Sequence, residues 1–313
     1  GKSFIQAATN QEVWAVARYN SDGSLDTSFG TGGILTPNLL VCTGCNQEAY
    51  AVLQQPDNSL VIMGRVAEDN SGSTYNTALI RLNTDGTYDN TFDGDGIDIE
   101  NLSPGNEEPR AMSLQSDGEF VVAGGLSGNA VDFFVARFNA TGGLDSTFDG
   151  DGVSVVSGSA GTDRAVAVKA LSDGKIAAIG EKQEGGTHAM AIRLESNGSL
   201  DATFGTGGIA TIPISSPENN VYGGTFGTND KIYAIGYEYP NSGDTRYDFD
   251  AEVFNADGTT DTGFDGDGHV VTPIGFNDES DAQGVAIQPD GKIVAVGTGR
   301  PSGGDDFVVV RYN

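Results

Sequence analysis

The feature that most constrains the fold of this chain is a unit that recurs along its whole length. One landmark of the unit is a short apolar run after a turn, as at residues 119–124, 175–180 and 292–297. A second landmark is a strand that ends in the motif arginine, then an aromatic residue or leucine, then asparagine. The arginine of this motif is Arg18 in the first copy and Arg311 in the last. The mean spacing over these five steps is about 59 residues, which exceeds one helical hairpin and fits a four-stranded sheet.

The segments around these landmarks predict strands rather than helices. They are short, rich in β-branched and aromatic side chains, and bounded by Gly, Asp, Asn or Pro, as strands usually are. Small four-stranded sheets must stack on neighbours to bury their apolar faces, and radial stacking gives a β-propeller. We therefore expect an all-β chain: one β-propeller domain of four-stranded antiparallel blades over residues 1–313, with no long helix. A β-solenoid and a linear array of sandwiches are the alternatives.

The repeat also carries a family resemblance. Residues 288–293 and 307–313, together with residues 24–30, resemble the bacterial delta-sixty repeat, and the Gly-Lys-Ile-aliphatic-aliphatic-Gly strand is similar to kelch-type blades. The resemblance spans essentially the whole chain. It implies a propeller in large, often exported bacterial surface proteins, and it brings no known catalytic residues.

The number of expected strands is 22, two short of six complete blades, so we expect the first and last units to be incomplete. Open strand edges invite pairing. We therefore expect either flanking sequence in a longer polypeptide or a partner chain that completes the terminal blades.

The charge and residue composition of the chain limit the classes of molecule that it can bind. The chain has 16 Lys+Arg and 44 Asp+Glu, a net charge of −28, which disfavours nucleic acids and anionic membranes. No apolar stretch is long enough to cross a bilayer. Cys42 and Cys45 are the only cysteines, and neither His188 nor His269 is near them in sequence, so a disulfide in an exported protein is favoured over a zinc site.

The loops predict two faces with different roles. The first-to-second and third-to-fourth turns repeat almost unchanged, whereas the loops on the opposite face vary in length and chemistry. Variable loops on a fixed scaffold usually carry recognition. We expect a ligand-binding face there, with tyrosines as stacking platforms for a sugar or an apolar epitope; packing within their own loops is the alternative. The candidate residues are Tyr75, Tyr237, Tyr239, Tyr247, Glu108, Arg110, Asp163 and Asp281.

The recurring arginine is followed eight residues later by an aspartate in four units, which predicts ion pairs that hold the third-to-fourth turns. An arginine ring that binds an anion is the alternative, although Val253 replaces the arginine in the fifth unit. The predicted pairs are Arg18–Asp26, Arg81–Asp89, Arg137–Asp145 and Arg193–Asp201, and Arg311 is the remaining copy.

Acidic turns raise the possibility of calcium. Three Asp-Gly-Asp-Gly turns offer closely spaced oxygen ligands, but two of the five equivalent turns lack carboxylates, which favours plain turn chemistry and no required cofactor. The candidate calcium ligands are Asp93, Asp95, Asp149, Asp151, Asp265 and Asp267.

We therefore expect a non-enzymatic, exported or cell-surface module for binding, adhesion or structure, whose partner is a glycan or a protein. One alternative is a metal-dependent hydrolase or lyase that acts at a central mouth. Its candidate residues are Glu48, Glu108, Asp163 and Asp281. The other alternative is a subunit of an extracellular assembly.

Overall fold

A computed structural model describes residues 2–5, 11–37, 39, 45–69, 72, 74–127, 130–156, 161–184, 186–212, 219–239, 246–274, 279–300 and 304–313; for residues 2–5 and 11 it describes the backbone alone. Within these ranges the regular structure consists of strands, with no helix. Accordingly, this part of the chain has no helix long and apolar enough to cross a membrane.

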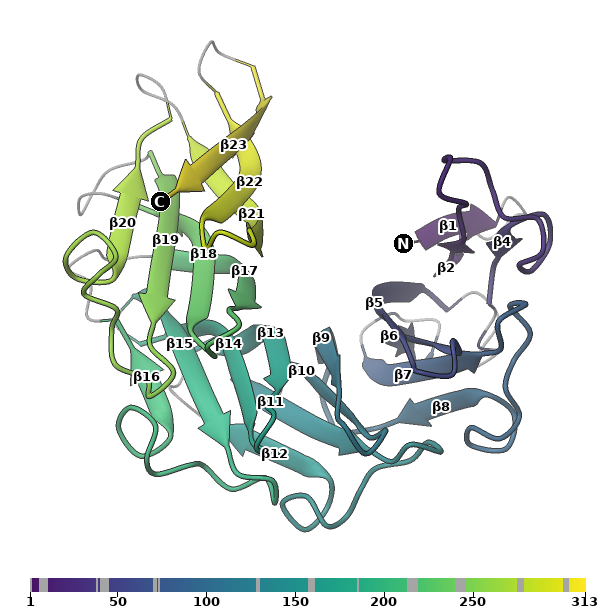
Figure 1. Ribbon diagram of the computed structural model, residues 1–313. Coiled ribbons are helices and arrows are strands. Elements are labelled where there is room, and N and C mark those ends of the chain that lie inside the picture. Colours follow the sequence, from purple (N-terminus) through teal and green to yellow (C-terminus); the bar gives the residue numbers. More distant parts are fainter. Residues whose placement is uncertain are drawn as a thin grey trace. The chain divides into compact units, whose positions relative to one another are not determined.

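Four consecutive repeats each form a four-stranded antiparallel sheet in which the strands follow one another in chain order (Figure 1). The first sheet contains β5 (Gln47–Gln54), β6 (Leu60–Ala67), β7 (Tyr75–Leu82) and β8 (Ile97–Glu100). The second contains β9 (Glu107–Leu114), β10 (Phe120–Ser127), β11 (Val131–Phe138) and β12 (Val153–Val156). The third contains β13 (Arg164–Ala170), β14 (Ile176–Gln183), β15 (Thr187–Leu194) and β16 (Ile209–Thr211). The fourth contains β17 (Asn219–Phe226), β18 (Ile232–Glu238), β19 (Asp248–Phe254) and β20 (His269–Thr272).

The first and last repeats have fewer strands, as expected. The last forms a three-stranded sheet of β21 (Ser280–Ile287), β22 (Ile293–Gly299) and β23 (Asp306–Tyr312). The first forms two pairs, β1 (Lys2–Ile5) with β2 (Gln11–Trp14) and β3 (Val16–Ala17) with β4 (Ile34–Leu35). Because β2 and β3 are one expected strand interrupted at Ala15, the described strands agree with the predicted set. The all-β architecture of four-stranded antiparallel units is confirmed.

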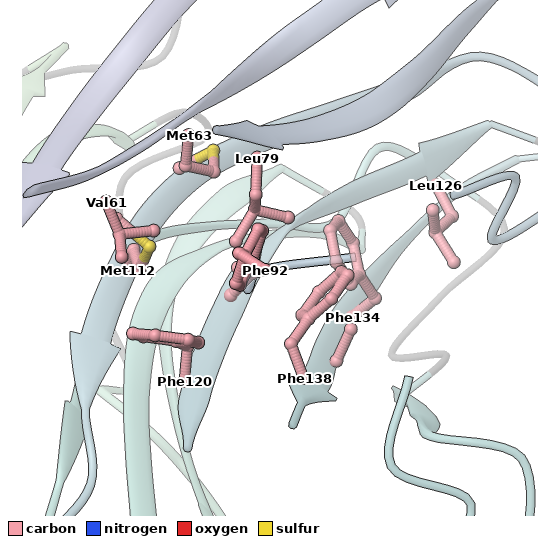
Figure 2. Close-up of a cluster of buried hydrophobic side chains, with 11 residues drawn as sticks. Val61, Met63, Leu79, Phe92, Met112, Phe120, Leu126, Phe134 and Phe138 are labelled. Atoms are coloured by element: carbon pink, nitrogen blue, oxygen red, sulfur yellow. The ribbon is translucent and has the colours of Figure 1, made fainter. Parts of the chain in front are cut away.

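The chain divides into two compact units, residues 1–129 with 134–153, and residues 130–133 with 154–313. Within each unit the core lies between neighbouring sheets rather than inside any one of them. Figure 2 shows one such core in the first unit, where Met63 and Leu79 of one sheet lie with Phe120 and Phe134 of the next. This packing explains why the sequence repeats as whole sheets: a single blade leaves its apolar faces unburied.

A bulge in the first strand and a glycine in the second strand recur together in each complete sheet. In the third sheet, the register of β13 with β14 shifts between Ala165 and Ala167, and Gly180 is paired with Ala165. A Cβ atom on Gly180 would lie 1.9 Å from the carbonyl oxygen of Arg164. The glycine of the repeat is therefore fixed by close backbone approach at the bulge. The equivalent glycines are Gly64, Gly124, Gly236 and Gly297.

Candidate functional site

The recurring arginines hold the third-to-fourth turns. In the second repeat, Arg81 Nε donates to Asp89 Oδ2 at 2.8 Å, and its Nη2 donates to the Thr91 hydroxyl at 2.6 Å. The guanidinium also lies over the ring of Phe92, 5.1 Å from its centroid. The same ion pair joins the other predicted partners, at Arg18–Asp26, Arg137–Asp145 and Arg193–Asp201.

The same arginines connect successive repeats. Arg81 Nη1 donates to the carbonyl oxygen of Ala140 at 2.6 Å, and Arg193 Nη1 donates to that of Ala256 at 2.6 Å. Each acceptor belongs to the equivalent turn of the next repeat. With their donors used in this way, these arginines serve the stacking of repeats, and the geometry gives no support to an anion-binding ring.

The fifth repeat keeps the arrangement with a different cation. Val253 occupies the arginine position, and Lys231, from the turn before β18, forms an ion pair with the equivalent Asp261. Arg311, the last copy of the arginine, is exposed. A cation therefore reaches the turn aspartate in this repeat without the arginine.

We expect Lys231→Met to lower the free energy of unfolding by about 1 kcal/mol, because a partly exposed ion pair is lost. The measurement is a denaturant midpoint at pH 7. Lys292→Met is the matched control, since Lys292 follows the equivalent turn and forms an ion pair with the neighbouring Asp290, at 3.2 Å. Equal midpoints for both variants would show that Lys231 does not replace the arginine.

The Asp-Gly-Asp-Gly turns use their aspartates for local turn geometry. Asp93 adopts a positive φ of 46°, and Asp95 Oδ1 accepts a hydrogen bond from the backbone N–H of Ile97 at 2.9 Å. The turns at Asp149–Asp151 and Asp265–Asp267 repeat this geometry. Among the described residues, these turns bring together no group of three carboxylates that could share an ion.

Three of the four predicted tyrosines meet in one cluster, and a fourth tyrosine that the sequence reading missed joins them. Tyr237 and Tyr247 are tilted against each other with ring centroids 4.4 Å apart. Tyr239 contacts both rings edge-on, at 5.7 Å and 5.6 Å. Tyr222 contacts Tyr237 edge-on at 5.4 Å and is 41% exposed. We call these four residues the tyrosine cluster.

Bulge geometry explains Tyr222. It occupies the register shift between Val221 and Gly223 in β17, and a bulge redirects a side chain that strict alternation would send elsewhere. Burial, followed by hydrogen bonding with Tyr222, raises the pKa of Tyr237 well above its ordinary value. The hydroxyl of Tyr237 therefore stays protonated at physiological pH.

Polar groups border the tyrosine cluster. The Tyr247 hydroxyl donates to Glu279 Oε2 at 3.5 Å, and Arg300 Nη1 donates to the same oxygen at 2.9 Å. The predicted Asp281 lies one strand position beyond Ser280 and accepts from Thr298 Oγ1 at 2.5 Å and Gln283 Nε2 at 2.8 Å. The cluster thus combines partly exposed rings with carboxylate and guanidinium groups.

Tyr75 belongs to the other unit. Its ring is covered by the guanidinium of Arg65, 4.2 Å from the ring centroid. Arg65 also donates to Glu48 at 2.8 Å and lies 4.0 Å from Glu108. Arg110, in turn, pairs with Glu108 at 3.1 Å. These residues form an ion-pair network rather than an open aromatic platform.

The acids predicted for a central mouth are held by other partners. Glu48 and Glu108 belong to the Arg65 network. Asp163 is fully buried, and its Oδ1 accepts from the backbone N–H of Gln183 at 2.9 Å. In the described part of the chain, none of the four mouth acids belongs to a group of three or more ligand side chains close enough to share an ion.

Cys45 is in a disulfide bond. The other residue of the predicted disulfide, Cys42, lies outside the described residues.

The sequence reading missed a buried ionisable group in the fourth sheet. His269 Nε2 lies 2.6 Å from Glu238 Oε2 and 2.8 Å from Asp250 Oδ1. Burial lowers the pKa of His269, but its close contacts with the carboxylates of Asp250 and Glu238 outweigh burial and raise it to about 11. Burial also raises the pKa values of Asp250 and Glu252. The signal in the sequence was the period-two run of acids, Asp248, Asp250 and Glu252.

Comparison with solved structures finds similarities over nearly the whole chain at low identity. A glucose dehydrogenase is 13% identical with a TM-score of 0.49, covering 100% of this chain and 95% of that one. A putative exo-β-1,3-galactanase from Bifidobacterium bifidum s17 is 12% identical with a TM-score of 0.38, covering 96% of this chain and 92% of that one. An endo-arabinase from Bacteroides thetaiotaomicron VPI-5482 is 10% identical with a TM-score of 0.41, covering 85% and 94%. Similarities at this level say nothing about the activity of this chain.

No curated protein matches the chain significantly in sequence. A family model does match it, under the description "Domain of unknown function (DUF5122) beta-propeller", at residues 6–29, 55–92, 115–148, 171–204 and 288–313. Four of these segments end at the phenylalanine that lies beneath a turn arginine, Phe29, Phe92, Phe148 or Phe204. The matched repeats and the four-stranded antiparallel sheets together identify the chain as a β-propeller repeat protein.

Proposed function

We propose that the protein is an exported, non-catalytic binding module that recognises a glycan through the tyrosine cluster. The observation that carries this proposal is the meeting of four partly exposed rings from β17, β18 and the segment before β19. Tyrosine offers an apolar face for the C–H surface of a sugar ring and a hydroxyl for its polar edge. A rigid sheet edge presents both at little cost in conformational entropy.

The neighbouring polar groups suit a neutral sugar. Glu279 and Arg300, which border Tyr247, supply an acceptor and donors of the kind that fix the orientation of a ligand on an aromatic surface. The net charge of −28 opposes anionic polysaccharides. The proposed ligand class is therefore a neutral glycan.

Two further features support export to a bacterial surface. The disulfide at Cys45 is typical of oxidising compartments. The motifs at residues 288–293 and 307–313 support the finer assignment of the repeats to the delta-sixty type, and this resemblance implies a bacterial surface protein that is often exported.

Binding to an array of neutral hexose and pentose oligosaccharides tests the proposal. For any glycan retained by the wild type, we expect Tyr222→Ala and Tyr239→Ala each to weaken the Kd by about tenfold, the loss of one ring contact. Tyr19→Ala is the control, because Tyr19 is 63% exposed and belongs to a turn of the invariant set. The proposal fails if the array binds nothing, or if Tyr19→Ala weakens binding as much as the cluster variants do.

A further inference from the structure

Five polar side chains share one face of the fourth sheet. In the register of this sheet, Asn219 is paired with Glu238, and Glu252 is paired with both Ala234 and His269. Asp250 lies two residues before Glu252 on β19 and points to the same face. All four strands of the blade therefore contribute to one group, which we call the β17–β20 cluster: Asn219, Glu238, Asp250, Glu252 and His269.

The preceding repeat has apolar residues at three of the five matching positions, those of Asp250, Glu252 and His269. Asp250 is paired with Gly236 and Glu252 with Ala234, whereas in the third sheet Met190 is paired with Gly180 and Ile192 with Ala178. His269 corresponds in the same way to Ile209, the partner of Ile192. At these three positions the fourth sheet has ionisable groups in place of apolar ones, which the stability of the fold alone does not require.

The cluster carries more negative charge than the chain neutralises. Asp250 and Glu252 are 2% and 1% exposed, and Glu238 is 6% exposed. Among the described residues, His269 is the one cationic side chain that contacts them. With all three carboxyls ionised, even a protonated His269 would leave two negative charges in a buried site, which is strongly unfavourable, so the site needs either bound protons or a further cation.

The other buried carboxylates of the described residues have compensating partners. Asp201 has two cations, Arg193 at 2.5 Å and Lys175 at 2.8 Å. Glu107, which has no cation, accepts the backbone N–H groups of Thr77 at 2.7 Å and Ser103 at 3.2 Å. Each remaining buried carboxylate contacts either an arginine or a backbone N–H group. These carboxylates are Asp98, Asp145, Asp163 and Glu181.

Several buried polar atoms in the cluster also lack a hydrogen-bond partner. Asn219 is fully buried and donates its Nδ2 to Asp250 at 2.5 Å and to Glu252 at 2.7 Å. Its Oδ1 has no hydrogen-bond partner, and neither does Glu252 Oε2. His269 Nε2 approaches two carboxylates, yet neither contact has hydrogen-bond geometry.

We propose that the β17–β20 cluster is a binding site for a divalent transition-metal ion of the zinc class, with His269, Asp250 and Glu238 as ligands. One ligand atom from each of these residues lies within 4.8 Å of the others. Imidazole nitrogen with carboxylate oxygen is a donor set that zinc accepts, with bonds of about 2.0–2.2 Å. Calcium prefers oxygen ligands alone, so the histidine favours a transition metal. Glu252 and the Asn219 amide stand beside these ligands as hydrogen-bonded support.

A divalent ion bound to neutral His269 would leave one net negative charge where a protonated His269 leaves two. The ion would also connect β18, β19 and β20 of one blade. Its role is therefore structural: it would crosslink a sheet that lacks the apolar face of its neighbour.

Metal binding to the chelator-treated wild-type protein provides the test. Addition of ZnCl₂ at about 100 times its Kd should bind one ion per chain by calorimetry and raise the Tm by about 4 °C. His269→Gln should lose this response. His188→Gln should keep it, since His188 is the other histidine of the chain and does not belong to the group of ligand atoms that could share the ion.

A second variant separates loss of metal from loss of folding. Asp250→Met, Glu252→Ile and His269→Ile together copy the preceding repeat at these positions, and Glu238→Gln removes the carboxylate that would otherwise stay buried without its cation. Apolar or neutral residues of similar volume commonly replace a buried ionic group without loss of stability. We expect this variant to fold with no zinc response. A wild-type protein that binds no zinc, a response retained in His269→Gln, or a response to CaCl₂ in place of ZnCl₂ would each overturn the assignment.

Discussion

Gly180→Ala is expected to lower the free energy of unfolding by about 3 kcal/mol, at the upper end of what overpacking usually costs. The added Cβ would lie 1.9 Å from the backbone oxygen of Arg164 and 2.7 Å from the Cα of Ala165. Backbone atoms cannot rotate away as a side chain can, so β13 and β14 must separate and lose hydrogen bonds. Chemical denaturation at neutral pH measures the effect.

Gly304→Ala is the control for this substitution, because nothing lies within 4 Å of a Cβ at Gly304. It should leave the denaturation midpoint unchanged. The same substitution at Gly236, where the Cβ would lie 1.7 Å from the Asn220 oxygen, should be at least as damaging as at Gly180. A mild effect at both positions would show that the bulge is not the reason for the repeated glycine.

Arg137→Ala is expected to cost about 3 kcal/mol of unfolding free energy, as removal of one partner from a buried ion pair does. Arg137 and Asp145 are each 7% exposed, and Arg137 also donates to Thr147 at 2.9 Å. Arg193→Ala should cost less, because Lys175 remains 2.8 Å from Asp201. Denaturant midpoints of the two variants provide the comparison, and an equal loss in both would contradict this account of the turns.

The pH dependence of the Arg137→Ala effect gives a second readout. Burial raises the pKa of Asp145, but hydrogen bonds from Thr147 and Arg137 outweigh burial and hold that pKa below its ordinary value. A carboxyl with a lowered pKa stabilises the folded state above its unfolded pKa of about 3.9 and loses that contribution as the pH falls. The difference between wild type and Arg137→Ala should therefore be largest near neutral pH and shrink below about pH 4.

Most of the fold could be predicted because the same sequence pattern recurs in six repeats. The spacing of apolar runs, turn residues and arginines specifies each blade, and agreement between copies corrects for local exceptions such as Val253. The Arg–Asp geometry could be anticipated for the same reason: the eight-residue spacing brings the two residues to the ends of one short turn, as in Arg81 and Asp89.

The candidate sites were less predictable because they depend on departures from the repeat. The direction of a strand side chain is inferred from the strict alternation of residues, and the bulge at Tyr222 breaks that alternation. Tyr237, Tyr239 and Tyr247 could therefore be predicted as a group from the sequence, whereas Tyr222 could not. Tyr75 was grouped with them by residue type, whereas Arg65 covers its ring. Sequence spacing does not reveal such a long-range partner.

The β17–β20 cluster was missed for another reason. His269 and Asp250 are 19 positions apart in sequence and become neighbours only through the pairing of β19 with β20. Position-by-position comparison with the preceding repeat would have exposed the change, because Met190, Ile192 and Ile209 mark the same positions as apolar.

The central claim is that ligand recognition belongs to the variable loops of this β-propeller protein, at the tyrosine cluster. NMR of protein labelled with ¹³C at the tyrosine rings, titrated with a neutral oligosaccharide that the protein retains, tests this claim directly. Shifts should be confined to the resonances of Tyr222, Tyr237, Tyr239 and Tyr247. Tyr75 and Tyr50 both lie under the guanidinium of Arg65, the second with its ring centroid 5.8 Å away. Shifts at these two residues, with the tyrosine cluster unchanged, would place recognition at the Arg65 network and contradict the claim.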